Sequence, residues 1–260
     1  MFKRAVVLAL GCGALAMGCG SQSQGGTEEI VENLVQAGFP RGDIQVVDGR
    51  VYTGWDAEVS LEASREMLQS DATSEEQYRT TNLVSTSVTN ICVNGSAFNN
   101  ISKFNTALNN AIANYNAQPI RWHMTRTNGS TTGCSATITA RVAAGVTGGS
   151  SGFPSGGHPF NTINIGDGLE SSTFGVNTVT HVITHELGHT VGFRHSDYFN
   201  RSISCGGSPT NEGAGSVGAI HIAGTPTGAT VGGSIMNSCF RTVETGKFTS
   251  TDVTALNTIY

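Results

Sequence analysis

The chain has 260 residues, of which 13% are charged, and its formal net charge at pH 7 is −5. This length suits one catalytic-size domain preceded by an N-terminal extension. The sequence contains no block of basic residues that would neutralise phosphates, which argues against a nucleic-acid-binding protein. Its 34 glycines and scarce lysines are typical of an exported, loop-rich protein that contains β-structure.

Residues 1–18 have the pattern of a secretory signal peptide. Lys3 and Arg4 form a basic start, and an apolar stretch from Ala5 to Met17 follows. This stretch is too short to span a bilayer as a stable helix, but it has the length of the apolar region of a secretory leader. We therefore expect the protein to be exported, with residues 1–18 outside the folded domain.

The end of this leader resembles a bacterial lipobox. The box reads Leu15-Ala16-Met17-Gly18-Cys19, which makes Cys19 the candidate for lipidation. The alternative is an ordinary signal peptide that is cut near Gly20. With the lipid anchor, Gly20 in place of Asp favours a bacterial outer-membrane or cell-surface lipoprotein, whose folded part can be released to the extracellular space. The polar run 20–26 then serves as a flexible tether.

The segment 19–80 contains the most acidic part of the chain. Ile30, Leu34 and Val35 have helical spacing, and two β-prone runs on either side of Asp48-Gly49 predict a hairpin. A charged, helix-prone stretch follows the hairpin. We interpret 19–80 as a tether and a removable pro-segment, and the alternative is a tether or small accessory domain.

From residue 81 to residue 260 the pattern predicts one mixed α/β domain. Strands are expected at 86–93, 120–125, 135–143 and 162–165, with a glycine- and serine-rich loop at 145–157. Apolar residues between Ile101 and Tyr115 recur every three or four positions, which predicts an amphipathic helix. Further helices are expected at about 176–191 and 251–259, the last capped by Thr249 or Ser250.

The cysteine content fits an exported protein. Of six cysteines, Cys12 and Cys19 belong to the leader, and the four that remain allow three disulfide connectivities. We expect pairing within each half of the domain, which gives Cys92–Cys134 and Cys205–Cys239. The competing interpretation, a cysteine zinc site, lacks any C-x-x-C spacing.

The strongest chemical signal is the run from His185 to His195, which reads HELGHTVGFRH. Residues four apart lie on one face of a helix, so His185 and His189 can direct their imidazoles to one ion. Gly192 can take the positive φ that ends a helix and turns the chain sharply, which brings His195 round as a third ligand. Three histidines leave a fourth position open for water, the arrangement of catalytic zinc sites.

Glu186 adjoins the first ligand and is the candidate general base. Zinc acidifies its bound water and polarises a scissile carbonyl, while Glu186 takes the proton and later delivers it to the leaving amine. A lone histidine is more often an ordinary core or surface residue. We keep that interpretation for His123, His158, His181 and His221.

The same run matches the long zinc-binding motif of the metzincins, H-E-x-x-H-x-x-G-x-x-H. Downstream, Ser234-Ile235-Met236-Asn237 resembles the Met-turn that supports the metal in that group, with Met236 as its methionine. Ser238 stands where some metzincins carry an additional tyrosine ligand, so that ligand is not expected.

More specifically, the chain resembles the dual-action HEIGH metallopeptidase family, with Leu187 in place of the family's Ile. The similarity lies in the segments 152–155, 185–197, 224–226, 234–238 and 252–260. It implies an α+β, metzincin-type fold with a mixed twisted sheet, an active-site helix, a Met-turn and a C-terminal helix. It also implies a zinc endopeptidase whose protein or peptide substrate lies extended along the last sheet strand before the active-site helix, here an edge strand at Thr162–Ile165.

The N-terminal segment suggests how such an enzyme is kept latent. Metzincin zymogens often block the zinc with a Cys or Asp of the pro-segment. No cysteine lies between Cys19 and Cys92, but Gly54-Trp55-Asp56 places a carboxylate beside an aromatic ring. We therefore hypothesise that Asp56 ligates the zinc in the latent form. The alternative is that Asp56 is an ordinary surface or hairpin residue.

Two further alternatives stay open at this level. The chain can be a non-catalytic surface lipoprotein that keeps the zincin fold as a binding module, although Glu186 and all three histidines are present. Calcium is a second candidate cofactor, with Asp167 or Asp197 as donors, but the sequence contains no calcium-binding motif. A structural role for Asp197, bonding the backbone at a turn, is the simpler expectation.

Overall fold

The computed structural model describes residues 24–68, 78–213, 219–226 and 228–260. The signal peptide expected at 1–18 and the lipidation candidate Cys19 lie outside these residues. Within the described ranges, every helix is too short or too polar to cross a membrane.

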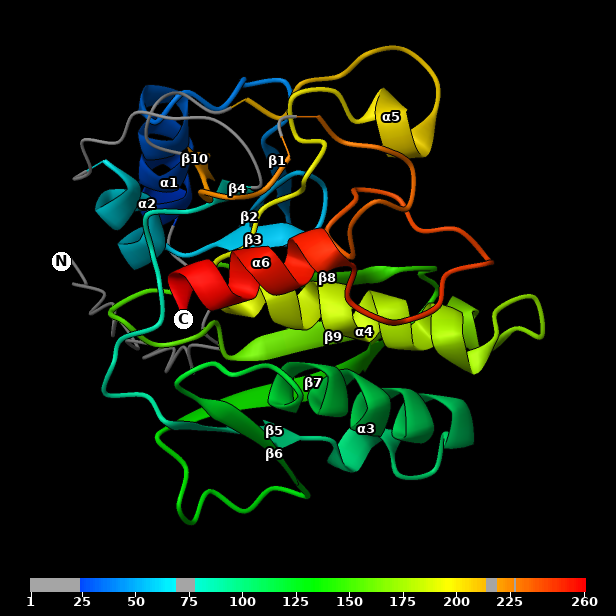
Figure 1. Ribbon diagram of the computed structural model, residues 1–260. Coiled ribbons are helices and arrows are strands. Elements are labelled where there is room, and N and C mark those ends of the chain that lie inside the picture. The colour runs from blue at the N-terminus through cyan, green and yellow to red at the C-terminus, as the bar shows by residue number, and fades with distance from the viewer. Residues whose placement is uncertain (1–23, 69–77, 214–218, 227) are drawn as a thin grey trace, which may run out of the picture.

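A mixed sheet of eight strands, in the order β1-β2-β3-β8-β9-β7-β5-β6, runs through the molecule (Figure 1). Its strands β5, β6, β7 and β9 are parallel, and β8 is antiparallel to β9. The strands are β1 (Gln45–Val47), β2 (Arg50–Thr53), β3 (Ala57–Val59), β5 (Asn90–Asn94), β6 (His123–Thr127), β7 (Ala136–Ala143), β8 (Gly149–Gly152) and β9 (Thr162–Gly166). A separate pair joins β4 (Tyr78–Arg79) to β10 (Ile220–His221).

Two long helices, α3 (Ser102–Asn116) and α4 (Val176–Thr190), pack side by side against this sheet (Figure 1). Their apolar faces and the buried strand residues form one large core, in which Leu108, Ile138 and Ile183 are fully buried. The remaining helices are α1 (Gln24–Gln36), α2 (Leu61–Met67), α5 (Ser202–Cys205) and α6 (Ser250–Ile259), with 3₁₀ turns at Ser96–Phe98 and Asp167–Glu170. The predicted α+β class with a mixed sheet is confirmed.

Residues 24–68, here called the N-terminal unit, have a small core of their own. It is built from α1, α2 and the β2–β3 strands, and Phe153 of the main domain joins it. The predicted hairpin forms between β1 and β2, where Asp48 (φ 50°) and Gly49 (φ 76°) make the turn. Two successive residues with positive φ are the geometry of a type I′ turn, which Asp-Gly favours.

The expected edge strand at Thr162–Ile165 is wrong. This strand, β9, lies inside the sheet, with β7 on one side and β8 on the other. The extra strand β8 arises from the run that we expected to be a loop. This run of glycines and serines has no alternation of apolar and polar side chains, so its sequence does not predict a strand. The small residues are needed because the neighbouring strand lies very close: a Cβ on Gly152 would come within 2.6 Å of the Glu58 carbonyl oxygen.

The outer edge of β8 is covered by the N-terminal unit. Strand β3 runs parallel to β8, with Ala57 opposite Ser151 and Glu58 opposite Gly152. The backbone N–H of Ser151 donates to the Asp56 carbonyl at 2.8 Å. The N-terminal unit and the main domain therefore share one continuous sheet.

The chain between the units is tied to the main domain at Tyr78–Thr80. The Arg194 N–H donates to the Tyr78 carbonyl, and the Thr80 N–H donates to the Gly192 carbonyl, each at 2.8 Å. Tyr78 and Arg79 also form the strand that pairs with β10. We call residues 78–260 the C-terminal unit, since 78–80 pack with it.

Both expected disulfides are present in the structure. Cys92–Cys134 joins β5 to the loop before β7, and Cys205–Cys239 joins α5 to the segment after Met236. Their Cα–Cα separations are 5.5 Å and 5.1 Å, within the range that a disulfide requires.

Candidate metal centre

Helix α4 carries the first half of the motif through the centre of the molecule. All its residues from Thr178 to Thr190 are buried, so His185, Glu186 and His189 project into a packed interior. The chain leaves the helix at Gly192, whose φ is 103°. A Cβ at this position would lie 2.7 Å from the Asn82 carbonyl oxygen, so both the conformation and the space require glycine.

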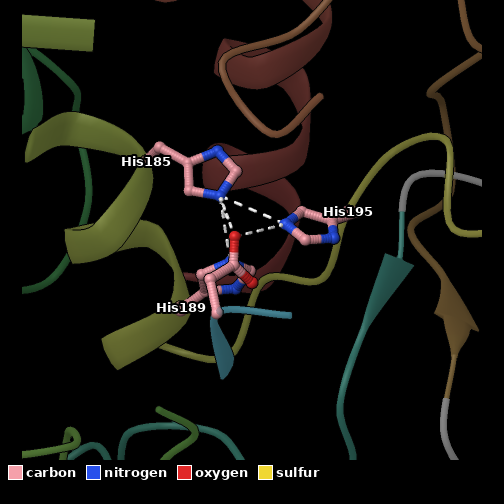
Figure 2. A group of neighbouring side chains, drawn as sticks. His185, His189 and His195 are labelled. Atoms are coloured by element: carbon pink, nitrogen blue, oxygen red, sulfur yellow. Dashed lines mark hydrogen bonds and ion pairs between the residues drawn. The ribbon is translucent and has the colours of Figure 1, made fainter. Parts of the chain in front are cut away.

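The sharp turn at Gly192 brings His195 back to the two helix histidines. Figure 2 shows the three imidazoles close together. The Nε2 atoms of His185 and His189 lie 3.0 Å apart, and those of His185 and His195 lie 3.2 Å apart. The three imidazoles predicted from the motif are therefore directed at one point.

The contacts of the Nδ1 atoms show whether the Nε2 atoms of His185 and His189 carry a proton or a free lone pair. Nδ1 of His185 lies 2.8 Å from the Ile235 carbonyl, and Nδ1 of His189 lies 2.8 Å from the Phe193 carbonyl. Because a carbonyl only accepts hydrogen bonds, each Nδ1 holds the ring proton and each Nε2 has a free lone pair. Burial also favours the neutral ring of His189, whose pKa it lowers to about 4.

The lone pairs meet a carboxylate from the N-terminal unit. Asp56 Oδ2 lies 3.1 Å from Nε2 of His195 and 3.5 Å from Nε2 of His185, and its Oδ1 lies 3.5 Å from Nε2 of His189. Converging lone pairs and a carboxylate repel one another unless a cation lies between them, so the four residues fit a metal ion. The carboxylate that we proposed from Gly54-Trp55-Asp56 thus lies at the motif histidines.

Without a metal, a proton takes the cation's place in the balance of charge. Burial alone would raise the pKa of Asp56, but the positive charge of His195 lowers it well below 3.8. Burial opposes a charge on His195 as well, yet Asp56 and Glu212 raise its pKa well above 6.5. Metal and proton therefore compete for the same lone pairs.

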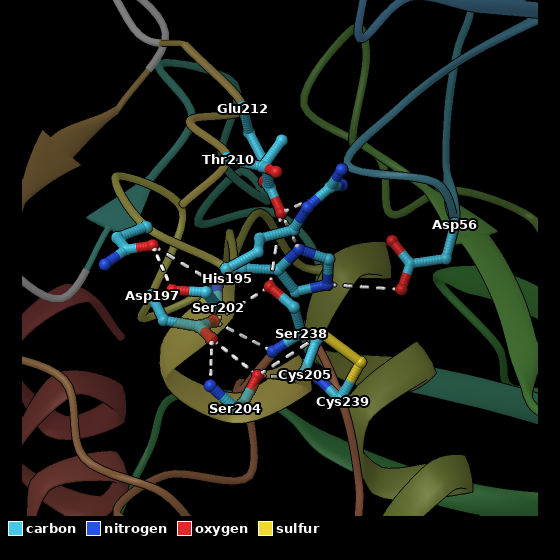
Figure 3. Close-up of a disulfide and its surroundings, with 12 residues drawn as sticks. Asp56, His195, Asp197, Ser202, Ser204, Cys205, Thr210, Glu212, Ser238 and Cys239 are labelled. Atoms are coloured by element: carbon cyan, nitrogen blue, oxygen red, sulfur yellow. Dashed lines mark hydrogen bonds and ion pairs between the residues drawn. A yellow bond between two sulfur atoms is a disulfide. The ribbon is translucent and has the colours of Figure 1, made fainter. Parts of the chain in front are cut away.

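Glu212 is a part of the centre that we did not predict. Its Oε1 lies 2.6 Å from Nδ1 of His195, on the opposite side of the ring from Asp56 (Figure 3). Burial opposes its ionisation, but the charge and hydrogen bond of His195, together with Arg194, lower the pKa of Glu212 to about 2. A carboxylate behind a ligating imidazole fixes the tautomer and makes Nε2 a better donor. The only sequence signal was that Glu212 is the sole acidic residue between Asp197 and Glu244.

Glu186 faces the centre without joining the ligand cluster. It is 2% exposed, and its Oε2 has no hydrogen-bond partner among the described residues. A Cβ on Gly149 would overlap the Glu186 carboxyl, so the glycine leaves room for it. Burial raises the pKa of Glu186 well above 4.5, and the charge of Asp56 raises it further. A buried carboxyl with a raised pKa is suited to take up and release a proton.

A turn at Ser234–Asn237 supports the centre from below. The Met236 Sδ packs against Gly188 of α4, where a Cβ would come within 2.6 Å of it. The turn is held by Asp252 at the start of α6, which accepts hydrogen bonds from Ser234 Oγ at 2.5 Å and Ile235 N–H at 3.0 Å. The Ile235 carbonyl in turn accepts a hydrogen bond from Nδ1 of His185, so α6 helps to orient this histidine through Asp252 and the turn.

The other residues considered from the sequence have structural contacts. The Asp197 carboxylate accepts hydrogen bonds from Ser204 and Ser238, which tie together the two segments joined by Cys205–Cys239 (Figure 3). Asp167, the other candidate calcium donor, accepts a hydrogen bond from the Gly145 N–H. His181 lines a cavity of about 250 Å³ beside Glu186.

The structure is similar to two solved structures of myroilysin. One has 14% sequence identity and a TM-score of 0.40, with 69% of this chain and 95% of that chain covered. The other has 14% identity and a TM-score of 0.39, with 73% and 93% covered. Among curated proteins, no sequence matches.

The metzincin-type arrangement expected from the sequence, in which a mixed sheet, a histidine-bearing helix, a Met-turn and a C-terminal helix surround one site, is what the chain adopts. The family model described as "Dual-action HEIGH metallo-peptidase" matches residues 51–260, which include both the histidine cluster and Asp56. A match over this much of the sequence shows that the chain belongs to the dual-action HEIGH metallo-peptidase family.

Proposed function

We propose that this metallopeptidase is a zinc-dependent endopeptidase in which Glu186 is the general base. The convergence of three Nε2 lone pairs carries the proposal, since imidazole nitrogen with one carboxylate oxygen is a donor set that zinc prefers. At bond lengths of about 2.0–2.1 Å, tetrahedral zinc separates its ligands by about 3.4 Å. The observed separations of 3.0 to 3.5 Å are close to that figure.

Zinc, when bound, would act as a Lewis acid on the scissile carbonyl and lower the pKa of water. His185, His189 and His195 would hold it, with Glu212 orienting His195. Glu186 then accepts a proton from the attacking water and passes it to the leaving amine. Its burial, raised pKa and unsatisfied Oε2 support both steps.

We further propose that the chain is latent as long as Asp56 stays at the histidine cluster. The carboxylate would take the ligand position that substrate and water need. The adjoining strand β3 also covers the edge of β8, where an extended peptide would otherwise pair its backbone. Substrate would then bind along β8, in place of β3, after the N-terminal unit is displaced.

The site of action proposed for this enzyme is outside the cytoplasm. The leader at 1–18 and the candidate lipid anchor at Cys19 would export the protein to a bacterial outer membrane or cell surface. Two disulfides support export, because such bonds persist in oxidising compartments. Residues 19–80 would serve as tether and pro-segment.

Casein hydrolysis by the full chain, before and after activation with a trace of trypsin that is then blocked by a trypsin inhibitor, tests the proposed chemistry. Activated protein should cleave casein, a chelator should abolish cleavage, and zinc should restore it. The Glu186→Gln variant should bind zinc equally well but lose activity by a factor of about 10²–10⁴, the usual contribution of a general base. A variant with parental activity would refute the role of Glu186, and chelator-resistant cleavage would refute the metal.

A further inference from the structure

Arg201 is a buried guanidinium that the N-terminal unit covers. Its Nη2 donates to Asp43 Oδ1 at 2.9 Å, and its Cζ lies 3.6 Å from the centre of the Trp55 ring. The side chain is 2% exposed, and its Nε and Nη1 make no hydrogen bond to any described residue. The N-terminal unit thus supplies both the carboxylate that pairs with Arg201 and the ring that shields it.

The C-terminal unit offers Arg201 only a share in one carboxylate among its described residues. Arg201 Nη1 lies 3.5 Å from Glu212 Oε1, but Glu212 also faces Nδ1 of His195 at 2.6 Å and Nη2 of Arg194 at 3.4 Å. While the units are docked, the two arginines balance Asp43 and Glu212. Once the N-terminal unit leaves, Glu212 is the only acidic partner of Arg201 among the described residues of the C-terminal unit, and Arg194 and His195 share it, so Arg201 carries a positive charge that is not fully balanced.

This excess charge lies close to the metal centre. Trp55, which covers Arg201, directly precedes Asp56, which contacts the three histidines. The same stretch of chain continues into β3, on the edge of β8. In a peptide that replaces this stretch, the residue beside Arg201 is therefore next in sequence to the residue at the metal, as Trp55 is next to Asp56.

We propose that Arg201 forms a substrate subsite that binds an acidic side chain next to the scissile bond. The inference deepens the proposed peptidase function and depends on it. Asp43 shows the chemistry that the guanidinium accepts, a carboxylate at hydrogen-bond distance in a buried setting. A guanidinium left without that partner gains most from another carboxylate, because its fork of N–H groups matches one closely.

Twin peptides that differ by Glu or Gln at each position flanking the cleaved bond test the subsite. The full chain is activated with a trace of trypsin and loaded with zinc, and kcat/KM is measured for each twin. At one of the flanking positions the Glu peptide should be preferred on the order of tenfold, mainly through KM, as for a hydrogen-bonded charge pair. The preference should shrink as sodium chloride is raised, since salt screens a partly exposed pair.

Arg201→Gln should bring the Glu/Gln ratio close to one, and Arg201→Lys should retain part of it, because lysine keeps the charge but loses the fork. Arg126→Gln, which removes a charge on β6 at the opposite edge of the sheet, should leave the ratio unchanged. Equal cleavage of all twins by an enzyme that digests casein would overturn the subsite and leave the peptidase proposal intact. A preference that survives in Arg201→Gln, or that is indifferent to salt in the parent, would also overturn it.

Discussion

Removing the Asp56 carboxylate should release the full-length chain from latency. The carboxylate is the one group through which the described residues of the N-terminal unit reach all three histidines, at 3.1 to 3.5 Å. Breaking a buried charged contact from one side costs about 3–5 kcal/mol. At 1.4 kcal/mol per factor of ten, this raises the undocked fraction by about two to four powers of ten. We therefore expect Asp56→Ala to raise the peptidase activity of uncut protein by up to that factor, limited by the activity of fully activated enzyme.

Activity in Asp56→Ala could come from loss of the Asp56 ligand or from self-cleavage of the chain, so the assay must distinguish the two. Fluorogenic peptide hydrolysis is followed on full-length protein whose mass is checked before and after. In parallel, Co²⁺ replaces the native metal in the inactive Glu186→Gln background, and its visible spectrum is compared with and without Asp56→Ala. Asp48→Asn is the matched control, since Asp48 lies in the exposed hairpin turn of the same unit. Equal latency and identical cobalt spectra in parent and Asp56→Ala would show that Asp56 is not a ligand.

Three other predictions follow from contacts around the site. Glu212→Gln should weaken metal binding by about 10–100-fold, as measured by competition with a chromogenic chelator, because His195 loses its charged partner. Gly149→Ala should lower kcat while the metal content stays unchanged, since the added methyl group overlaps the Glu186 carboxyl. Lys103→Met should lower the free energy of unfolding in urea by about 2–4 kcal/mol, because the Lys103 ammonium shares its three N–H groups among four carbonyl oxygens at 2.7–3.1 Å. Lys247→Met, which loses one contact at 3.2 Å, should have a smaller effect.

Local patterns predicted the parts of the site that lie close together in the sequence. The i, i+4 histidines required only a helix, and Gly192 indicated where that helix ends and the chain turns. Asp48-Gly49 likewise predicted its hairpin, because the preference for positive φ belongs to those two residues.

The parts that escaped prediction depend on long-range contacts. Strand β8 consists of Gly149-Ser150-Ser151-Gly152, residues whose own preference is for loops, and it forms because β9 and β3 both pair with it. Glu212 lies 17 residues after His195 in a loop, where no periodicity links the two side chains. For Asp56, the aromatic-acid pair was visible, but its partners lie more than 120 residues away.

The position of Glu212 couples metal binding to docking of the N-terminal unit. One carboxylate orients His195 and also faces Arg201, the residue that holds Asp43 and Trp55. Asp56 adds a second link, because a divalent ion at the histidine cluster stabilises its charge more strongly than the single proton that His195 carries without one. Coupling between two binding events is reciprocal, so whatever strengthens the metal site also holds the N-terminal unit more tightly. A chelator should therefore loosen the N-terminal unit as well as remove the metal. Chelation should then increase the rate of backbone hydrogen exchange in β3 by a larger factor than in β7, and an equal change in both strands would contradict the coupling.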